Sequence, residues 1–208
     1  MVLVGDHHQL PAVETGGSFA ALVGGLDPVE LVTNRRQVEA WEADALARLR
    51  TGVGGRSGIA DVVDDYDTHG RVQIGENPAE VRAAMALDWY RAQRDGERAV
   101  MVALRRDDVA ELNVRARAML VADGTLDDTD AVTVGDRAFS AGDRVVCGRN
   151  DRRIGVHNAL AGMITAIQPG AGTSGPVVCF ADDGGNDYAV PVSYVEAGHL
   201  DHGYATTI

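Results

Sequence analysis

A carboxylate and a glutamine follow the first apolar run of the chain, in the segment GDHHQLP at residues 5–11. The run itself, residues 2–4, has the unbroken apolar character of a buried strand. Ligands of open α/β sheets bind beyond the carboxyl ends of such strands. Gln9 could donate to a phosphate oxygen and orient a water, and Asp6 could reach a metal-bound water. The segment alone predicts a phosphate or metal-water site, with a polar loop that closes a strand as the alternative.

Two arginine-rich segments offer further polar chemistry. The first is NRRQ at residues 34–37, and the second is RNDRR at residues 149–153. A planar guanidinium donates to two phosphate oxygens at once, so either segment could neutralise phosphate charge. A solvated helix start is the alternative for the first segment, and a solvated turn is the alternative for the second.

The elements that must position these segments change in character near residue 135. Before it, apolar runs and helical periodicities alternate, which is typical of an α/β sheet. After it, short strands are separated by glycine-rich turns, which predicts a small inserted β-barrel. Strands are expected at residues 28–32, 100–103, 144–148, 159–167, 175–181 and 188–192, and helices at residues 18–23, 38–50, 78–94 and 107–121. We expect residues 56–76 to be irregular or partly stranded, and residues 197–208 to be helix-prone.

The composition narrows the classes of function. The 208 residues carry a net charge of −12 and contain no lysine, so the chain cannot hold a phosphate-binding loop of the G-x-x-x-x-G-K-[ST] type. This charge is a poor match to a generic nucleic-acid binder, although local charge along a groove matters more than the total. No apolar run reaches the ~20 residues of a membrane span. Cys147 and Cys179 lie far apart without metal-type spacing, so we expect a cytoplasmic protein with free thiols and no metal site.

Five segments, taken in order, resemble superfamily 1 DNA helicases of the RecD-like branch, which includes the helicase part of conjugative relaxases. GDHHQLP resembles motif III of that family, and NRRQ resembles its motif IV. Residues 100–117 resemble its strand and helix that end in L-N-x-x-A-R. Residues 142–167 resemble its small Src-homology-3-like barrel, and residues 200–208 resemble the start of its motif V. The order of all five across nearly the whole chain is more specific than any one of them.

The resemblance implies an α/β fold, a partial RecA-like P-loop NTPase helicase core with an inserted small Src-homology-3-like β-barrel. Residues 1–33 would be the C-terminal remnant of the first RecA-like domain, and residues 34–134 the first part of the second. Residues 135–196 would form the barrel, and residues 197–208 would return to the second domain. The chain would then be a fragment that lacks the phosphate-binding loop and the acidic motif II.

The resemblance also implies roles at a nucleotide. Gln9 matches the motif III glutamine that senses the γ-phosphate, and Asp6 would hold its loop or reach the metal-bound water. Arg36 matches the motif IV arginine that acts across the cleft like an arginine finger, with Arg35 as the alternative if the register shifts by one. Gln37 would orient Arg36. ATP and Mg²⁺ would be the cofactors of the intact parent protein, and we expect neither to bind tightly to this chain alone.

A second implied set of residues faces single-stranded DNA, the expected partner. Its members come from the segments that resemble motif III, the L-N-x-x-A-R helix, the barrel and motif V: His8, Pro11, Asn113, Arg117, Arg149, Arg152, Tyr204 and Thr207. A hydroxyl such as that of Thr207 can bond a phosphate, and a ring such as that of Tyr204 can stack on a base. For Asn113 and Arg117 the alternative is a helix face packed on the sheet.

These roles predict a fragment of an ATP-dependent helicase that moves 5′ to 3′ along single-stranded DNA, from the helicase part of a conjugative relaxase. The missing N-terminal part, with the phosphate-binding loop, would be its second partner, and the chain alone would not hydrolyse ATP. A non-enzymatic nucleic-acid-binding or regulatory module is the alternative. A metallophosphoesterase built on residues 5–8 is the third hypothesis, but the G-N-H segment that it needs is absent from the sequence.

Overall fold

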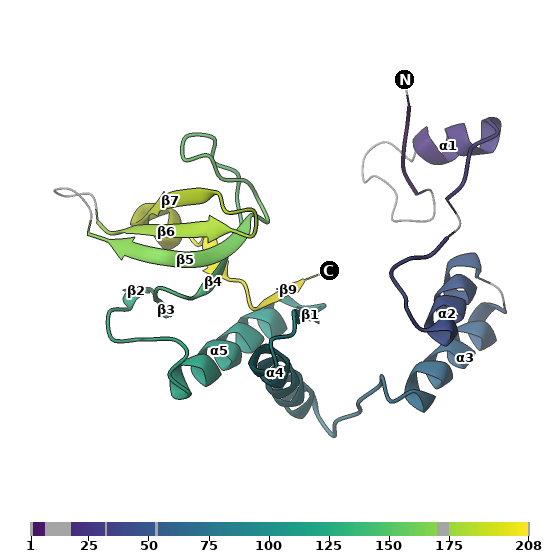
Figure 1. Cartoon of the computed structure of the whole chain (residues 1–208), viewed down its shortest axis with the longest axis horizontal. Helices are drawn as coiled ribbons and strands as arrows, with labels where there is room; N and C mark the ends of the chain where they lie inside the picture. The colour runs from purple at the N-terminus through teal and green to yellow at the C-terminus, as the bar shows by residue number, and fades with distance from the viewer. Residues whose placement is uncertain (1, 7–17, 32, 53, 170–174, 208) are drawn as a thin grey trace. The chain divides into compact units, whose positions relative to one another are not determined.

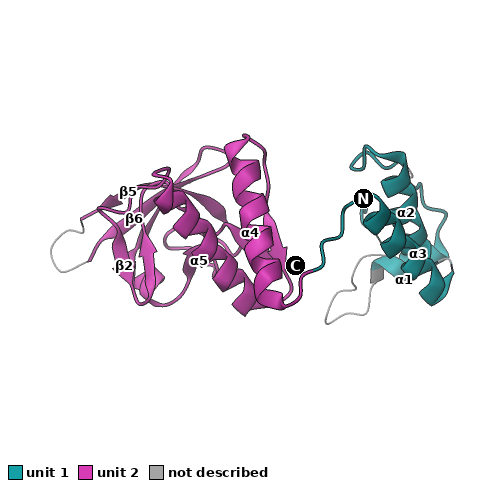
Figure 2. Ribbon diagram, turned by 90° about the horizontal axis from the view of Figure 1, so that it is seen from below, with its two compact units in different colours: residues 1–74 teal, residues 75–208 magenta. Residues whose placement is uncertain are grey.

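The chain forms two compact units, residues 1–74 (unit 1) and residues 75–208 (unit 2), which Figure 2 colours separately. The computed structural model describes the following parts of them: residues 2–6, 18–31, 33–52, 54–169 and 175–207. Most of the buried apolar residues among these belong to unit 2. Unit 2 therefore holds the larger core.

The described part of unit 1 is helical. Its helices are α1 Ser18–Gly25, α2 Ala40–Thr51 and α3 Gly55–Thr68 (Figure 1). Gly52 ends α2 with a φ of 64°, in the left-handed region that glycine adopts without strain. Across the α2–α3 pair, Trp41 stacks on His69 with ring centroids 3.8 Å apart. Ala45 and Val62 are buried in this pair, which makes its core small.

Helix α3 shows that our expectation of irregular or stranded structure is wrong for residues 56–68, whereas residues 69–76 lie in no helix or strand. Ile59, Val62, Val63 and Tyr66 recur at helical spacing, but the segment is so polar that this period is easily overlooked. Of this stripe, Val62 is buried and the ring of Tyr66 contacts that of Trp41 in α2, whereas Ile59 and Val63 are exposed.

The apolar segments at residues 2–4 and 28–32 form no strand in the described residues, contrary to our expectation. Val2 is 87% exposed and Val29 is 95% exposed. A strand is stable only beside a partner that takes up its N–H and C=O groups. The described residues of unit 1 supply no such partner, so apolar character alone does not produce a strand here.

Unit 2 begins with an α/β layer. This layer consists of α4 Pro78–Arg94, β1 Met101–Ala103, α5 Arg106–Ala122 and β9 Ala205–Thr207. β1 and β9 pair in parallel, with Met101 opposite Ala205. Between helices and strands lie the buried side chains of Trp89 and Leu112. The mixed α/β class that the sequence predicts is confirmed.

The starts of the two long helices differ in their caps. Asn77 caps α4: its Oδ1 accepts a hydrogen bond from the backbone N of Glu80 at 3.0 Å, and Pro78 occupies the first turn. α5 has no side-chain cap bond: it begins at Arg106, and Asp107 and Asp108 follow within the helix. The two aspartates lie in its first turn, where their charge favours the helix dipole.

The second layer of unit 2 is antiparallel. A hairpin of β2 Val132–Val134 and β3 Arg137–Phe139 precedes a sheet of order β7-β6-β5-β4-β8. The strands of this sheet are β4 Arg144–Cys147, β5 Ala161–Gln168, β6 Val177–Asp182, β7 Asp187–Pro191 and β8 Leu200–His202, with α6 Val192–Glu196 between β7 and β8. Phe139, Phe180 and Leu200 are fully buried in its core. That this sheet is a Src-homology-3-like barrel stays a prediction, as does the division at residues 33, 134 and 196.

Among the described residues from 197 to 207, two short strands form, β8 and β9, so the expected helix-prone character is wrong. β8 pairs with β4, with Val145 opposite His202, and β9 pairs with the distant β1. Long-range pairing therefore overrides local propensity at this end of unit 2. Among the described residues, no helix combines the length and the apolar character that crossing a membrane requires.

Candidate functional site

The arginine-rich segment at residues 149–153 borders a hollow of about 640 Å³ on unit 2. We call it the arginine hollow, and its lining residues are Arg149, Asn150, Asp151, Arg152, Arg153, Ile154, Pro191, Ser193, Tyr194 and His199. Two hydrogen bonds fix the segment: the hydroxyl of Tyr194 donates to the backbone O of Arg149 at 2.5 Å, and the backbone N of Asn158 donates to Asn150 Oδ1 at 2.7 Å. Burial raises the pKa of Tyr194 to about 12, so its hydroxyl stays protonated and keeps donating.

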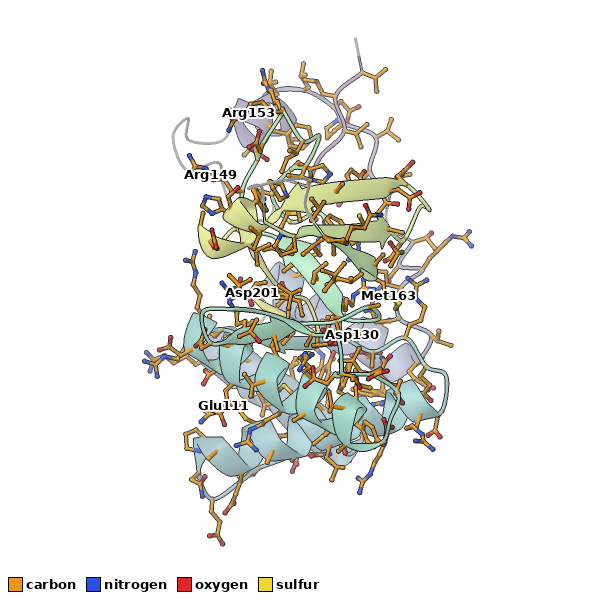
Figure 3. The ribbon with its side chains drawn as sticks, turned by 90° about the vertical axis from the view of Figure 1, so that its left-hand side faces the viewer. Glu111, Asp130, Arg149, Arg153, Met163 and Asp201 are labelled. Carbon is orange, nitrogen blue, oxygen red and sulfur yellow. The ribbon has the colours of Figure 1, made fainter. Side chains whose placement is uncertain are left out.

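The charges of the arginine hollow favour an anion. Arg149 donates to Nε2 of His199 at 3.2 Å, and Arg153 pairs with Asp151 at 3.2 Å. Arg152 is exposed, and it has no ion-pair partner among the described residues. The hydrogen bonds from Arg153 hold the pKa of Asp151 below its usual range, so one carboxylate stands against three guanidinium groups. Figure 3 shows Arg149 and Arg153 on the side of the sheet away from Glu111 of α5.

The arginine segment of unit 1 is held by its own asparagine. Oδ1 of Asn34 accepts hydrogen bonds from the backbone N of Arg36 at 2.9 Å and of Gln37 at 3.4 Å. Nδ2 of Asn34 donates to Oε1 of Gln37 at 2.7 Å, so the side chain of Gln37 contacts Asn34. Arg35 and Arg36 are exposed, and neither has an ion-pair partner in the described part of the chain. Both guanidinium groups are thus available to an anion.

The segment that resembles motif III is only partly described. Gln9, His8 and Pro11 lie outside the described residues, and their roles stay predictions. Asp6 pairs with Arg50 of α2 at 3.0 Å, a contact that the sequence did not indicate. Asp6 is therefore engaged in an ion pair within unit 1.

Three of the residues predicted to face DNA come together inside unit 2. Asn113, Arg117 and Tyr204 meet around the carboxylate of Asp143, which is completely buried. We call this group, with Ser140 and His202, the Asp143 cluster. Asn113 is 3% exposed and Tyr204 is 4% exposed, so neither side chain is at the surface. The packing alternative describes the position of Asn113 and Arg117.

The Asp143 carboxylate accepts hydrogen bonds from three elements. Arg117 Nε of α5 donates to Oδ2 at 3.1 Å, and the Tyr204 hydroxyl donates to Oδ1 at 2.6 Å. The backbone N of Ser140, in the turn between β3 and β4, donates to Oδ2 at 2.7 Å. A buried charge is tolerated only when it is paired and hydrogen-bonded in this way. Arg117 also donates to Asp128 at 2.5 Å.

Burial sets the protonation of the two rings beside this carboxylate. It raises the pKa of Tyr204, with the charge of Asp143 adding to the effect, so the phenol remains a donor. It lowers the pKa of His202, which favours the neutral imidazole. Nε2 of His202 lies 3.0 Å from the carbonyl O of Ala138, so this nitrogen carries the proton.

The remaining predicted contact, Thr207, is exposed on β9 opposite Ala103. Because β1 and β9 are parallel, their carboxyl ends lie at one edge of the layer, where ligands of α/β sheets bind. Among the described residues, no three His, Cys, Asp or Glu side chains gather into a group that could hold a metal ion.

Sequence reasoning missed Asp143, Ser140 and His199. The only local signal for Asp143 is its spacing of three residues from Ser140, which suits a turn closed by a side chain. Its partners Arg117 and Tyr204 are 26 and 61 residues away in the chain, and no pattern in a single sequence predicts such a pairing.

Comparison with known proteins relates the chain to conjugal transfer proteins. It is 33% identical over 210 residues to the probable conjugal transfer protein TraA of Sinorhizobium fredii, and 33% identical over 211 residues to the conjugal transfer protein TraA of Agrobacterium fabrum. Each match covers 100% of this chain and 18% of the relative. Residues 1–77 also match the AAA domain family. The chain thus spans less than a fifth of these relatives.

Solved structures give a more distant likeness. The Pif1 helicase of Bacteroides in complex with ADP-AlF3 and single-stranded DNA is 16% identical, with a TM-score of 0.45 over 98% of this chain and 51% of that one. Bacteroides Pif1 bound to single-stranded DNA is 15% identical, with a TM-score of 0.46 over 86% of this chain and 42% of that one.

Proposed function

We propose that this chain, a superfamily 1 helicase-like sequence related to conjugal transfer proteins, serves an ATP-dependent translocase that moves 5′ to 3′ along single-stranded DNA. The similarity to conjugal transfer proteins supports the assignment to helicase-like proteins. The 5′-to-3′ direction of movement follows from the resemblance to the RecD-like branch. The single observation that carries DNA binding is the arginine hollow, a concave basic surface on a chain whose net charge is −12.

Phosphate recognition is the role that we assign to the arginine hollow. Arg152 is exposed without an ion-pair partner among the described residues, so no carboxylate must be displaced before it binds. Arg149 is held at its backbone by Tyr194 and at its guanidinium by His199, which orders the group before a ligand arrives. An ordered donor loses less conformational entropy on binding than a mobile one. The wall of Tyr194 and Ile154 beside these groups suits the apolar faces of nucleotides.

Nucleotide chemistry is the role that we assign to the arginine segment of unit 1. Arg36 would neutralise charge on a triphosphate whose phosphate-binding loop and magnesium ligands belong to another stretch of polypeptide, because this chain has no lysine for such a loop. Arg36 is fixed at its backbone by Asn34 and exposed at its guanidinium, as an arginine finger must be. Gln9 would sense the γ-phosphate. This chain alone is then expected not to hydrolyse ATP.

DNA binding is tested by fluorescence anisotropy with a labelled oligo-dT strand across a series of NaCl concentrations. The double variant Arg149→Ala/Arg152→Ala is expected to bind more weakly. Its dependence of log K on log salt should be shallower by about 0.7 for each lost phosphate contact. The matched control is Arg91→Ala/Arg98→Ala, which removes the same charge from residues outside the hollow. Equal losses in both double variants would overturn the role of the hollow.

The role of Arg36 is tested in the full-length protein that carries a phosphate-binding loop. Arg36→Ala is expected to lower DNA-stimulated ATP hydrolysis by roughly 10³-fold, the lower end of what an arginine finger contributes. Arg35→Ala, its neighbour, is expected to lose far less, and the reverse ranking would favour the shifted register. Unchanged hydrolysis in both variants would show that neither arginine acts on the triphosphate and would overturn the role assigned to this segment.

A further inference from the structure

We infer that the Asp143 cluster is a rigid joint that couples the arginine hollow to β9, with Asp143 as its positioning residue. The inference deepens the proposed function, because it assigns the path by which a load on DNA at the hollow reaches the α/β layer. Tyr204, Asn113 and Arg117 then act on DNA indirectly, through the position of the elements that they hold.

Two neighbouring strands connect the hollow with the cluster. β4 starts at Arg144, directly after Asp143, and ends at Cys147, two residues before Arg149. β8 starts at Leu200, directly after His199 of the hollow, and ends at His202 of the cluster. The strands are antiparallel and hydrogen-bonded, with Cys147 opposite Leu200. Both therefore have the hollow at one end and the cluster at the other, about 13 Å apart for a strand of four residues.

The corner between β8 and β9 is fixed by a second set of bonds. Nδ2 of Asn113 donates to the backbone O of His202 at 2.9 Å, and its Oδ1 accepts from the backbone N of Ala205 at 2.8 Å. Between them, the backbone N of Gly203 donates to the backbone O of Arg144 at 2.8 Å. A Cβ on Gly203 would lie 3.1 Å from the backbone O of Val145, so only glycine allows this approach without displacement.

The cluster ties three parts of unit 2 at one point. Arg117 comes from α5, Ser140 comes from the turn before β4, and Tyr204 comes from the residue before β9. In Figure 1, β9 lies between the antiparallel sheet and the helices α4 and α5. Because the shared carboxylate is buried and satisfied by all three, rotating one layer against the other would leave a buried charge without donors.

The joint is tested by residual dipolar couplings of the ¹⁵N-labelled full chain. In the unaltered protein, the amides of α4, α5, β1 and β9 and those of the antiparallel sheet are expected to fit a single alignment tensor. In the double variant Tyr204→Phe/Asn113→Ala, the two layers are expected to need different tensors while each still fits its own. A single shared tensor in this variant would overturn the inference, since a merely stabilising role predicts no change in relative orientation.

Tyr204→Phe alone keeps the ring against Trp89 and removes one hydroxyl, so it is the mildest variant and the fallback if the double variant unfolds. In it, two-tensor behaviour or raised amide exchange confined to Ala205, Thr206 and Thr207 is expected, and exchange raised uniformly across unit 2 would contradict a joint. The matched control is Tyr90→Phe, which removes a similar 2.7 Å bond to Asp123 that links α4 with the end of α5 only.

A second arm follows the ¹⁵N spectrum during titration with oligo-dT. Binding at the hollow is expected to shift the amides of Thr206 and Thr207 in the unaltered chain, and to shift them less in Tyr204→Phe at equal saturation. Shifts of equal size in both would contradict the coupling. The dipolar couplings need no DNA, so the failure of DNA binding and the failure of the joint are distinguishable.

Discussion

Unit 1 and unit 2 use their apolar residues in opposite ways. Unit 2 contains two buried apolar clusters, one between the helices and β1–β9 and one within the antiparallel sheet. In unit 1, the buried apolar side chains of the described residues are Ala45 and Val62, while Val29 is 95% exposed. The difference teaches that an apolar segment is buried only where another element of the chain packs against it.

The contrast is clearest between two similar apolar segments. Met101–Ala103 lies beside β9 and under α4 and α5, and the side chain of Met101 is 2% exposed. Residues 28–31 also carry two large apolar side chains, Val29 and Leu31, but both are more than 90% exposed in the described part of unit 1. Stability should therefore be concentrated in unit 2, and substitutions in the two units should differ in size.

The largest effect is expected from Phe180→Ala in the antiparallel sheet. Phe180 is 1% exposed, and a buried phenylalanine truncated to alanine costs about 3–5 kcal/mol. Urea unfolding can be followed by the fluorescence of Trp89 in a Trp41→Phe background, because the chain contains two tryptophans, one in each unit. A loss below about 1 kcal/mol would mean that the core of unit 2 is far looser than its burial indicates.

The next largest effect is a dependence of the free energy of unfolding of unit 2 on pH, through the titration of His202. Burial lowers the pKa of its folded imidazole, so between about pH 6.5 and that lower value the unfolded chain binds more protons. The free energy of unfolding should fall as the pH drops through this window. Other charged groups around the ring are Asp143, Arg117 and Asp201.

Urea unfolding at pH 7.5, 6 and 5 measures this slope. His202→Gln retains an N–H for the carbonyl O of Ala138 and does not titrate, so the slope should be smaller in this variant. An equal slope in both proteins would assign the pH dependence to other groups.

A smaller effect is expected at the helix caps. Asn77→Ala removes the side chain that accepts from Glu80 and should destabilise unit 2 by about 1 kcal/mol. Glu39, at the corresponding position before α2 in unit 1, makes no side-chain cap bond, so Glu39→Ala should change little. Urea unfolding read by Trp89 for the first variant and by Trp41 for the second checks the pair, and equal losses would contradict the assigned caps.

The smallest effect is expected from Val29→Ala in unit 1. A nearly fully exposed side chain has little apolar surface to lose, so the change should stay within about 0.5 kcal/mol. Amide hydrogen exchange in α2 and α3 is the measurement. A marked rise in exchange would show that Val29 is buried in solution and would break the contrast between the units.

The sequence predicts those features of the structure that depend on residues close together in the chain. The cap at Asn77, the long helices on either side of β1 and the arginine segment at residues 149–153 could all be identified from the sequence, because each depends on neighbours within a few residues. Asp143, β8 and β9 could not, since their structure depends on partners many residues away. Tyr204 is instructive: its ring and hydroxyl suit a contact to DNA, but a carboxylate 61 residues earlier takes the hydroxyl.

The parallel pairing of β1 with β9 has a consequence for how the chain folds. Met101 meets Ala205, 104 residues later, with the whole antiparallel sheet between them. A ribosome must therefore release that entire sheet before β1 can find its neighbour. Closing so long a loop is slow. We therefore expect β1 and the apolar faces of α4 and α5 to remain exposed to solvent during synthesis. This stretch should then be the one most in need of a chaperone.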